Sequence, residues 1–517
     1  MLAARPGGAR QIHSPSEFAS KKAPVADVSV TLVTNIAADY PAPDCAFSPG
    51  EPYPEYALDH VSPAPNPIYT AVRRLLADRG LDKDRFGSPE WNPLRELVPE
   101  GSRVFVLCNF VYHRRFQESE RDFQAKCIHG SVLRALIDYV LLAAGPEGRV
   151  TFGNASLQSC RFDRVLVDTG ADRVESFYRE QGLPVRARDL RLFVASRDPL
   201  GRVTSIDRRD ERDGIEFDLG RQSLLAPMSA AGDPAFRISE YDPRRIQAFH
   251  DGGRHRYVIH RDVLDSDVVI SLSKLKTHEK VGITCGLKGF VGSVGHKDCL
   301  AHHRFGNPGM GGDEYPDSHA FLAPLSRCHD WVNRRSADAP LQGLAQIADK
   351  TLRRAWRLTR LIGAGAWHGN DTAWRMTLDL ARIVYYGTAA GTMESRPQRR
   401  HLSLIDGIVA GEGDGPLAPS PIHAGTLLFG DDVALTDRVA CRLMGFDPEL
   451  IPLVREAFRL ATWPITEREP DESAECVIGG RPCLESALAP VLSRSFVPPI
   501  GWKPLLGRNV GRREAAL

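Results

Sequence analysis

Residues 267–305 read DVVISLSKLKTHEKVGITCGLKGFVGSVGHKDCLAHHRF. The first six residues form an apolar, β-branched run, which predicts a buried strand. The chain then becomes rich in lysine, histidine and glycine, and from residue 274 to residue 305 only Glu279 and Asp298 are acidic. Because glycine lets the backbone approach a ligand closely, this stretch, called the Lys/His loop below, is expected to hold an anion or a metal.

Three polar residues alternate at the end of the predicted strand. In an extended chain Lys274, Lys276 and His278 project to one face, which suits a phosphate or carboxylate. Lys288, in GLKG, reaches the same pocket if the loop doubles back, and a partly buried lysine can serve as a base or nucleophile. We therefore take Lys288 as a catalytic candidate and the other three as substrate-binding candidates. The alternative is a solvated basic loop.

Strands and helices alternate on either side of this stretch. Such alternation is typical of a parallel α/β sheet, in which ligands bind at the carboxyl ends of strands. The fold expected is α/β, with a mostly parallel, Rossmann-like sheet. The supporting segments are strands at 28–35, 102–109 and 149–154 and helices at 66–80 and 129–144.

A single α/β domain is expected, with four variations in composition along the chain. A β-rich excursion and a helical insertion interrupt it, a disordered leader precedes it, and an extension follows it. The predicted bounds are 1–25 for the leader, 26–470 for the domain, 187–245 for the excursion, 330–390 for the insertion and 471–517 for the extension.

Overall composition excludes several classes of protein. The formal net charge of +1 gives no general basis for nucleic-acid binding. None of the ten cysteines has C-x-x-C spacing, so neither a zinc ribbon nor an iron–sulfur cluster is expected. No apolar run approaches the roughly 20 residues of a membrane span, and the N-terminus lacks a signal-peptide core. A cytoplasmic protein with reduced thiols is expected.

An acidic, glycine-rich stretch, DGIVAGEGDGP, covers residues 406–416. Its carboxylates, on Asp406, Glu412 and Asp414, are candidate ligands of a hard cation such as Mg²⁺. Asp406 and Glu412 are also candidate general acid–base residues. The alternative is turn chemistry, since Asp-Gly pairs form turns readily.

Another candidate region opens the helix near residue 370. Asn370 and Arg375 could border an anion site, because Asn370 lies at the positive end of the helix dipole. A salt bridge between Arg375 and Asp379, one turn apart, explains the same residues without a ligand.

Histidines of the Lys/His loop form a further candidate. His296, His302 and His303 with Asp298 could ligate a metal. Solvated loop histidines are the alternative.

Several segments together resemble the domain-of-unknown-function 362 (DUF362) family. They are KLKTH at 274–278, TCGLKGFVGSVG at 284–295, IDGIVAGEGDGP at 405–416 and FGDDVALTDRVACRLMGFDP at 429–448. The resemblance extends over roughly residues 100–460. It includes VLCNFVYHRR, in which a strand ends at Asn109, and this adds Asn109 to the substrate-binding candidates.

Some members of that family carry a ferredoxin-like cluster domain. This chain lacks the closely spaced cysteines such a domain needs, so the resemblance does not imply a cluster here. The helical insertion indicates a longer branch of the family.

Three functions remain open from the sequence. The first is an enzyme acting on a phosphorylated or carboxylated small molecule, with a divalent metal as an option. The second is a redox or iron–sulfur-associated protein, and the third is a non-catalytic ligand-binding component of a biosynthetic assembly. No P-loop, kinase motif set or G-x-S-x-G elbow is present, so the reaction type is open.

Overall fold

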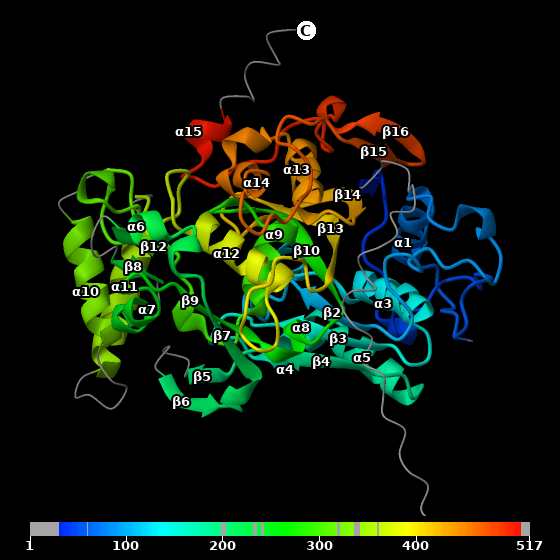
Figure 1. The fold of residues 1–517 in the computed structure, drawn as a ribbon, viewed down its shortest axis with the longest axis horizontal. Coiled ribbons are helices and arrows are strands. Elements are labelled where there is room, and N and C mark those ends of the chain that lie inside the picture. The colour runs from blue at the N-terminus through cyan, green and yellow to red at the C-terminus, as the bar shows by residue number, and fades with distance from the viewer. Residues whose placement is uncertain are drawn as a thin grey trace, which may run out of the picture.

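A computed structural model describes residues 30–58, 60–197, 203–230, 235–238, 242–317, 321–334, 342–358 and 361–507. The predicted leader, residues 1–25, lies outside the described residues. A ten-stranded sheet runs through the centre of the molecule (Figure 1). The predicted α/β class is therefore confirmed.

Five strands of this sheet are parallel neighbours. They are β2 (Arg103–Cys108), β3 (Arg149–Asn154), β4 (Val185–Asp189), β10 (Val268–His278) and β13 (Arg400–Glu412). Antiparallel and edge positions are taken by β1 (Val30–Val33), β11 (Gly282–Ile283), β14 (Ser420–Gly430), β15 (Glu475–Ile478) and β16 (Arg481–Leu484).

The order of the parallel strands is that of a doubly wound fold. Along the sheet they run β13-β10-β2-β3-β4. If these five strands are numbered by their order in the chain and read from the β4 side, the order is 3-2-1-4-5. The chain moves outward from β2 to β4 and then returns to the other side of β2 as β10. The carboxyl ends of β2 and β10 therefore flank the switch point, where ligands bind in this class of fold.

Helices cover both faces of the sheet, which explains why its central strands are almost continuously apolar. Alternate β2 residues enter two separate cores. Val104 and Val106 pack with α1 and α3, whereas Phe105 and Leu107 pack with α9, α12 and α13. The first helical layer contains α1 (Pro67–Asp78), α2 (Glu120–Lys126), α3 (Gly130–Ala144), α4 (Phe162–Thr169) and α5 (Ala171–Glu180).

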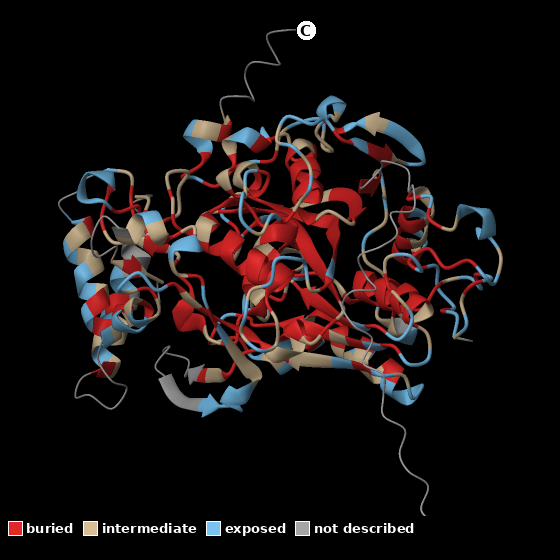
Figure 2. Ribbon diagram, in the orientation of Figure 1, coloured by how far each residue is buried: buried red, intermediate tan, exposed pale blue. Residues whose placement is uncertain are grey.

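The second layer includes the helices nearest the Lys/His loop. Burial is greatest in this central region of the molecule (Figure 2). Its helices are α9 (Cys285–Gly289), α12 (Ala373–Tyr386), α13 (Val433–Leu443) and α14 (Pro452–Ala457), and a short α15 (Lys503–Leu506) follows.

Helix starts follow the local sequence. The Asn66 side chain accepts a hydrogen bond from the Tyr69 N–H at the start of α1, and Pro67 occupies the first turn, as predicted. Among the described residues, no one helix has the length and apolar content of a membrane span. Only α2 and α3 taken together reach it, by length and composition, across a bend of 42°.

The predicted β-rich excursion consists largely of small antiparallel ladders outside the main sheet. These pair β5 (Phe193–Arg197) with β6 (Val203–Arg208), β7 (Gly214–Asp218) with β9 (Arg256–His260), and β8 (Phe236–Arg237) with β12 (His303–Arg304). Short helices α6 (Ala226–Ala230), α7 (Pro243–Phe249) and α8 (Arg261–Leu264) lie among them in the chain.

The predicted helical insertion divides into two parts. α10 (Leu322–Arg334) and α11 (Gln342–Leu358) lie together at one side of the molecule, away from the sheet (Figure 1). α12, by contrast, is buried along its length and packs in the core. Residues 373–386 are therefore part of the domain core rather than an inserted element.

The segment predicted as a C-terminal extension joins the same sheet. β15 pairs with β1 in parallel and with β16 in antiparallel orientation. Trp502 is buried, and its indole N–H donates to the Glu279 carbonyl. The chain up to residue 507 therefore packs on the domain, and the predicted boundary at residue 470 does not separate two bodies.

Candidate functional site at the carboxyl ends of β2 and β10

Lys276 and Asn109 meet across the switch point of the sheet. Asn109 follows β2, and Lys276 lies near the end of β10. The Lys276 ammonium donates to Asn109 Oδ1 at 2.9 Å and to the Lys126 carbonyl. Burial lowers the pKa of Lys276 to about 7, with Lys274 and Lys126 contributing in the same direction. Two predicted substrate-binding residues are thus brought together where the fold places a ligand site.

Lys274, two residues earlier, has a different role. Its Nζ donates to Asp406 Oδ2 at 2.9 Å and to the Tyr40 hydroxyl at 2.6 Å, and the Tyr40 hydroxyl donates to Asp406 Oδ1 at 2.6 Å. The Lys274 and Asp406 side chains are both 0% exposed. Their charges are therefore used within the fold, so neither Lys274 as a substrate anchor nor Asp406 as a metal ligand matches this geometry.

A cluster of cationic and imidazole side chains lies beyond Lys276. We call it the cation cluster. It comprises Lys276, His278, Lys280, Lys288, Lys297 and His302.

Burial lowers the pKa of His278 far below its usual value, and Lys288, Lys280 and Lys276 add to the effect. Burial has the same effect on the pKa of His302, where Lys288 and Lys280 are the strongest neighbouring charges. Both histidines are therefore neutral. Positive charge dominates their surroundings.

Lys288 differs from the other lysines of the cation cluster in having no partner. Among the described residues, no hydrogen bond or ion pair engages its ammonium, whereas Lys280 donates to the Ala364 carbonyl and Lys297 to the Ala155 carbonyl at 2.5 Å. Burial, with the nearby Lys280 charge, lowers the pKa of Lys288 to about 7. A partly buried ammonium without an anion is unfavourable, so this group is available for a ligand.

The hydrogen bonds of His278 define which nitrogen is free. Its Nδ1 accepts from the Lys280 N–H, so in the neutral ring Nε2 carries the proton. Within the described residues Nε2 has no partner. His278 thus adds a neutral donor beside the Lys288 ammonium.

Glycines allow α9, which carries Lys288, to lie directly on the sheet. A Cβ on Gly286 would lie 2.8 Å from Ser403 Oγ, and one on Gly289 would lie 2.5 Å from Ser271 Oγ. The Asp437 carboxyl accepts the N–H groups of Gly286 and Leu287 at 2.7 and 2.9 Å. The sequence could not show which N–H groups Asp437 binds, because 151 residues separate it from Gly286.

The remaining acidic candidates hold the C-terminal segment. Glu412 accepts both Arg494 guanidinium N–H groups at 2.9 and 3.0 Å and the Val497 N–H at 2.8 Å. Asp414 Oδ1 accepts the Ile500 N–H at 2.9 Å. Asp406 is instead engaged by Lys274 and Tyr40. Asp406, Glu412 and Asp414 therefore do not form one metal site, which corrects the prediction.

The Glu412 contacts give a testable expectation. Glu412→Gln removes the charge that Arg494 pairs with, so trypsin should cleave after Arg494 several-fold faster in the native protein, as measured by intact mass. Glu449→Gln, which removes an exposed partner of Arg459, is the matched control and should leave this cleavage unchanged. Equal cleavage in wild type and Glu412→Gln would show that Glu412 does not hold the segment.

Asn370 and Arg375 also have structural partners. Asn370 Oδ1 accepts the N–H groups of Thr372 and Ala373, and its amide nitrogen donates to the His302 carbonyl at 2.9 Å. Arg375 pairs with Asp371, one turn before it, rather than with Asp379 as predicted. Asn370 thus positions the backbone of the Lys/His loop, whereas Arg375 pairs with Asp371 rather than with a residue of the cation cluster.

The loop histidines do not assemble a metal centre. His296 lies 3.8 Å from Asp298, which also pairs with Arg245, while His302 Nδ1 bonds the Leu300 carbonyl. In the part of the chain that the structure describes, no three His, Cys, Asp or Glu side chains are grouped to hold a metal ion.

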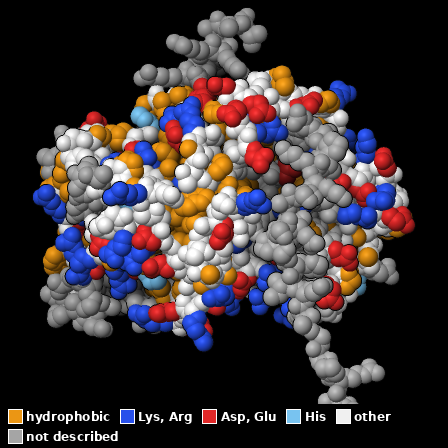
Figure 3. All heavy atoms as spheres, viewed as in Figure 1, with side chains coloured by type: hydrophobic (Ala, Val, Ile, Leu, Met, Phe, Trp, Pro, Cys, Tyr) orange, Lys and Arg blue, Asp and Glu red, His pale blue; other side chains and the backbone are white. Residues whose placement is uncertain are grey.

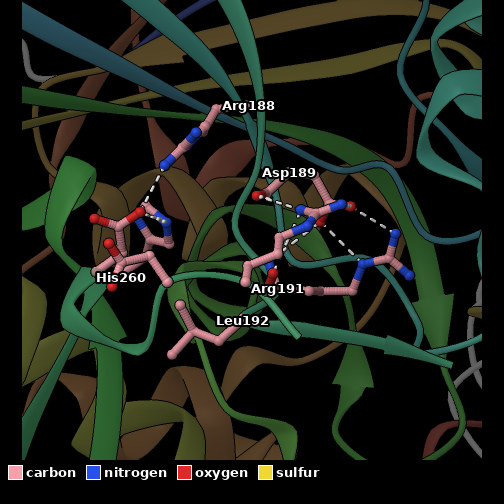
Figure 4. A pocket seen from close by; sticks show the side chains of 8 residues that line it. Arg188, Asp189, Arg191, Leu192 and His260 are labelled. Carbon is pink, nitrogen blue, oxygen red and sulfur yellow. Dashed lines mark hydrogen bonds and ion pairs between the residues drawn. The ribbon is translucent and has the colours of Figure 1, made fainter. Parts of the chain in front are cut away.

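A pocket of about 230 Å³ lies beside the cation cluster, between β4 and β9 (Figure 4). Its charges are mutually compensated: Asp189 pairs with Arg191 and Arg209, and Arg188 pairs with Asp213. Acidic and basic side chains are likewise interspersed over the visible surface (Figure 3). Uncompensated positive charge is therefore a feature of the cation cluster rather than of this pocket.

The sequence match to a known family covers this site. The family model described as domain of unknown function (DUF362) matches residues 228–442, a shorter range than the predicted resemblance. This range includes β10, the Lys/His loop, α12, β13 and β14, but not Asn109. No curated protein matches the chain. The cation cluster lies inside the part of the chain, residues 228–442, that matches the DUF362 family model.

Proposed function

We propose that this protein is an enzyme acting on an anionic small molecule, phosphorylated or carboxylated, bound at the carboxyl ends of β2 and β10. Lys288 is the charge anchor, and Lys276, His278 and Asn109 complete the contacts. The observation that carries the proposal is the unpaired Lys288 ammonium among further cations, with no neighbouring carboxylate among the described residues to neutralise it.

A bound anion would relieve the repulsion within the cation cluster. Burial disfavours the charged form of each lysine, and neighbouring cations add to this effect at Lys276, Lys288 and Lys297. An oxyanion would supply the opposite charge. The residues after β2 contain no glycine-rich fingerprint, so side chains rather than backbone N–H groups would hold the phosphate or carboxylate.

Proton transfer is the chemistry that this site could supply. Lys288, with its pKa of about 7, exchanges protons readily near neutral pH, where general acid–base catalysis is most effective. A divalent cation such as Mg²⁺ would enter with the anion, because Lys274 and Arg494 already engage Asp406 and Glu412. We also propose a cytoplasmic location, consistent with ten free cysteines.

Sulfate affinity should depend on pH if Lys288 binds the anion. Below pH 7 the ammonium is already charged and affinity is constant. Above pH 7 the free protein must first take up a proton, so affinity should fall about tenfold per pH unit. Calorimetric titration from pH 6 to pH 9 measures this, and sulfate is chosen because its own charge is constant over that range.

Turnover is tested separately. Phosphorylated and carboxylated metabolites that raise the melting temperature are incubated with the protein and followed by mass spectrometry, with Lys288→Met as the comparison. Conversion by wild type alone supports an enzyme. Tight binding with no conversion of any ligand would instead indicate a binding component, and a pH-independent sulfate affinity would remove Lys288 from the site.

A further inference from the structure

A pair of cysteines lies at the sheet edge, far along the chain from the cation cluster. β15 and β16 form a hairpin through Gly479 and Gly480, whose φ angles are +54° and +80°. Two consecutive residues with positive φ are typical of the tight turn that joins adjacent antiparallel strands. This register places Cys476 directly opposite Cys483.

The two thiols are already in contact. Their Sγ atoms are 3.3 Å apart, and both cysteines are free. Directly opposed antiparallel residues have Cα atoms about 4.5–5.5 Å apart, within the roughly 4.4–6.8 Å that disulfides span. A bond between the sulfur atoms therefore requires side-chain rotation but little backbone movement.

Exposure distinguishes the two thiols. Cys476 faces the core and is 1% exposed, and burial raises its pKa. Cys483 is partly exposed on β16, the last strand of the sheet. A reagent in solution therefore reaches Cys483 first, with Cys476 behind it as the second thiol.

We propose that Cys476 and Cys483 form a redox-active dithiol that exchanges with low-molecular-weight disulfides such as oxidised glutathione. The Cys483 thiolate attacks one glutathione sulfur, forming a mixed disulfide and releasing one glutathione thiolate. The Cys476 thiolate then attacks Cys483 Sγ, which forms the cross-strand bond and releases the second glutathione. The protein loses two electrons and two protons, and one oxidised glutathione becomes two reduced ones.

The site is independent of the anion site proposed above. Among the described residues, no hydrogen bond or ion pair links the cation cluster to the hairpin, and the short loop that the bond closes should gain less stability than a long loop would. Its effect is local, fixing the hairpin at the edge where β15 pairs with β1.

The experiment uses the full chain with Cys45→Ser and Cys328→Ser, which removes the two exposed thiols that could link molecules to each other. The protein is equilibrated at a series of reduced-to-oxidised glutathione ratios, quenched with acid, alkylated under denaturing conditions and digested with trypsin. Because trypsin does not cleave between Arg481 and Pro482, both cysteines remain in the peptide 469–494.

The expected result is one transition, from a doubly alkylated peptide to one that carries no alkyl group and has lost two hydrogen atoms. Peptides with the buried Cys108 and Cys299 should remain alkylated in the same digest. With Cys483→Ser, Cys476 should be alkylated at every ratio. A peptide doubly alkylated at the most oxidising ratio, or a lasting Cys483–glutathione adduct beside an alkylated Cys476, would overturn the proposal.

Discussion

Lys288→Met is expected to stabilise the unliganded protein at pH 7 and to abolish its stabilisation by millimolar sulfate. Methionine fills a similar volume without a charge, and replacing buried charged groups with well-packed apolar ones stabilises proteins by up to about 1–4 kcal/mol. Sulfate is expected to stabilise wild type by binding the folded state at the proposed site, and this effect should require the ammonium. The free energy of unfolding, measured by urea denaturation with and without sulfate, tests both the gain in stability and the loss of the sulfate effect.

The gain in stability should depend on pH in a defined direction. The folded pKa of Lys288, about 7, lies below the usual value of 10.5, so the unfolded chain binds more protons between these limits. The contribution of Lys288 to the free energy of unfolding of wild type therefore rises with pH between about 7 and 10.5. The advantage of Lys288→Met over wild type should accordingly be largest at or below pH 7 and shrink towards pH 9.

Lys83→Met is the matched control, because Lys83 is exposed on a distant turn. It should change neither the unliganded stability nor the sulfate effect, which also corrects for the general stabilisation of proteins by sulfate. If Lys288→Met destabilised the protein and still responded to sulfate like wild type, Lys288 would be a structural lysine and the anion site would lie elsewhere.

The pair formed by Lys274 and Asp406 is expected to be the most costly to break. Lys274→Met or Asp406→Asn alone leaves one buried group without its partner, which typically costs about 3–5 kcal/mol. The double variant should be less destabilised than the sum of the two, with a coupling on the order of 0.5–3 kcal/mol. Chemical denaturation of the four proteins measures this coupling.

An exposed pair serves as the comparison for this cycle. Glu449 and Arg459 lie 3.0 Å apart at the surface and should give a coupling of about 0–1 kcal/mol. If Asp406→Asn were as stable as wild type but lost ligand turnover, Asp406 would belong to the reaction, as the sequence predicted, rather than to the fold.

The positions of strands along the chain could be predicted from sequence because they depend on local patterns. β2, β3 and β10 are short apolar runs, and α1 begins at an Asn-Pro cap. These signals depend on neighbouring residues alone, so they locate elements without knowledge of the contacts between them. The end of β10 was predicted too early, since its polar residues Lys274 to His278 continue the strand.

The assignment of charges to partners could not be predicted in this way. Lys274 and Lys276 are equivalent in sequence, yet only Lys274 lies opposite Asp406 in the register of β10 and β13. Glu412 and Asp414 looked like metal ligands because the segment that neutralises them, near Arg494, follows some 80 residues later. Local patterns carry no information about such long-range pairs.

By itself, the sequence determined the fold class, the resemblance to the DUF362 family and the concentration of cations after one strand. The tertiary structure alone decided which of these cations lacks a counter-charge, because charge compensation depends on groups brought together by folding. Lys274 is neutralised by Asp406, Lys276 reaches Asn109 across the switch point, and Lys288 on α9 is without a partner among the described residues.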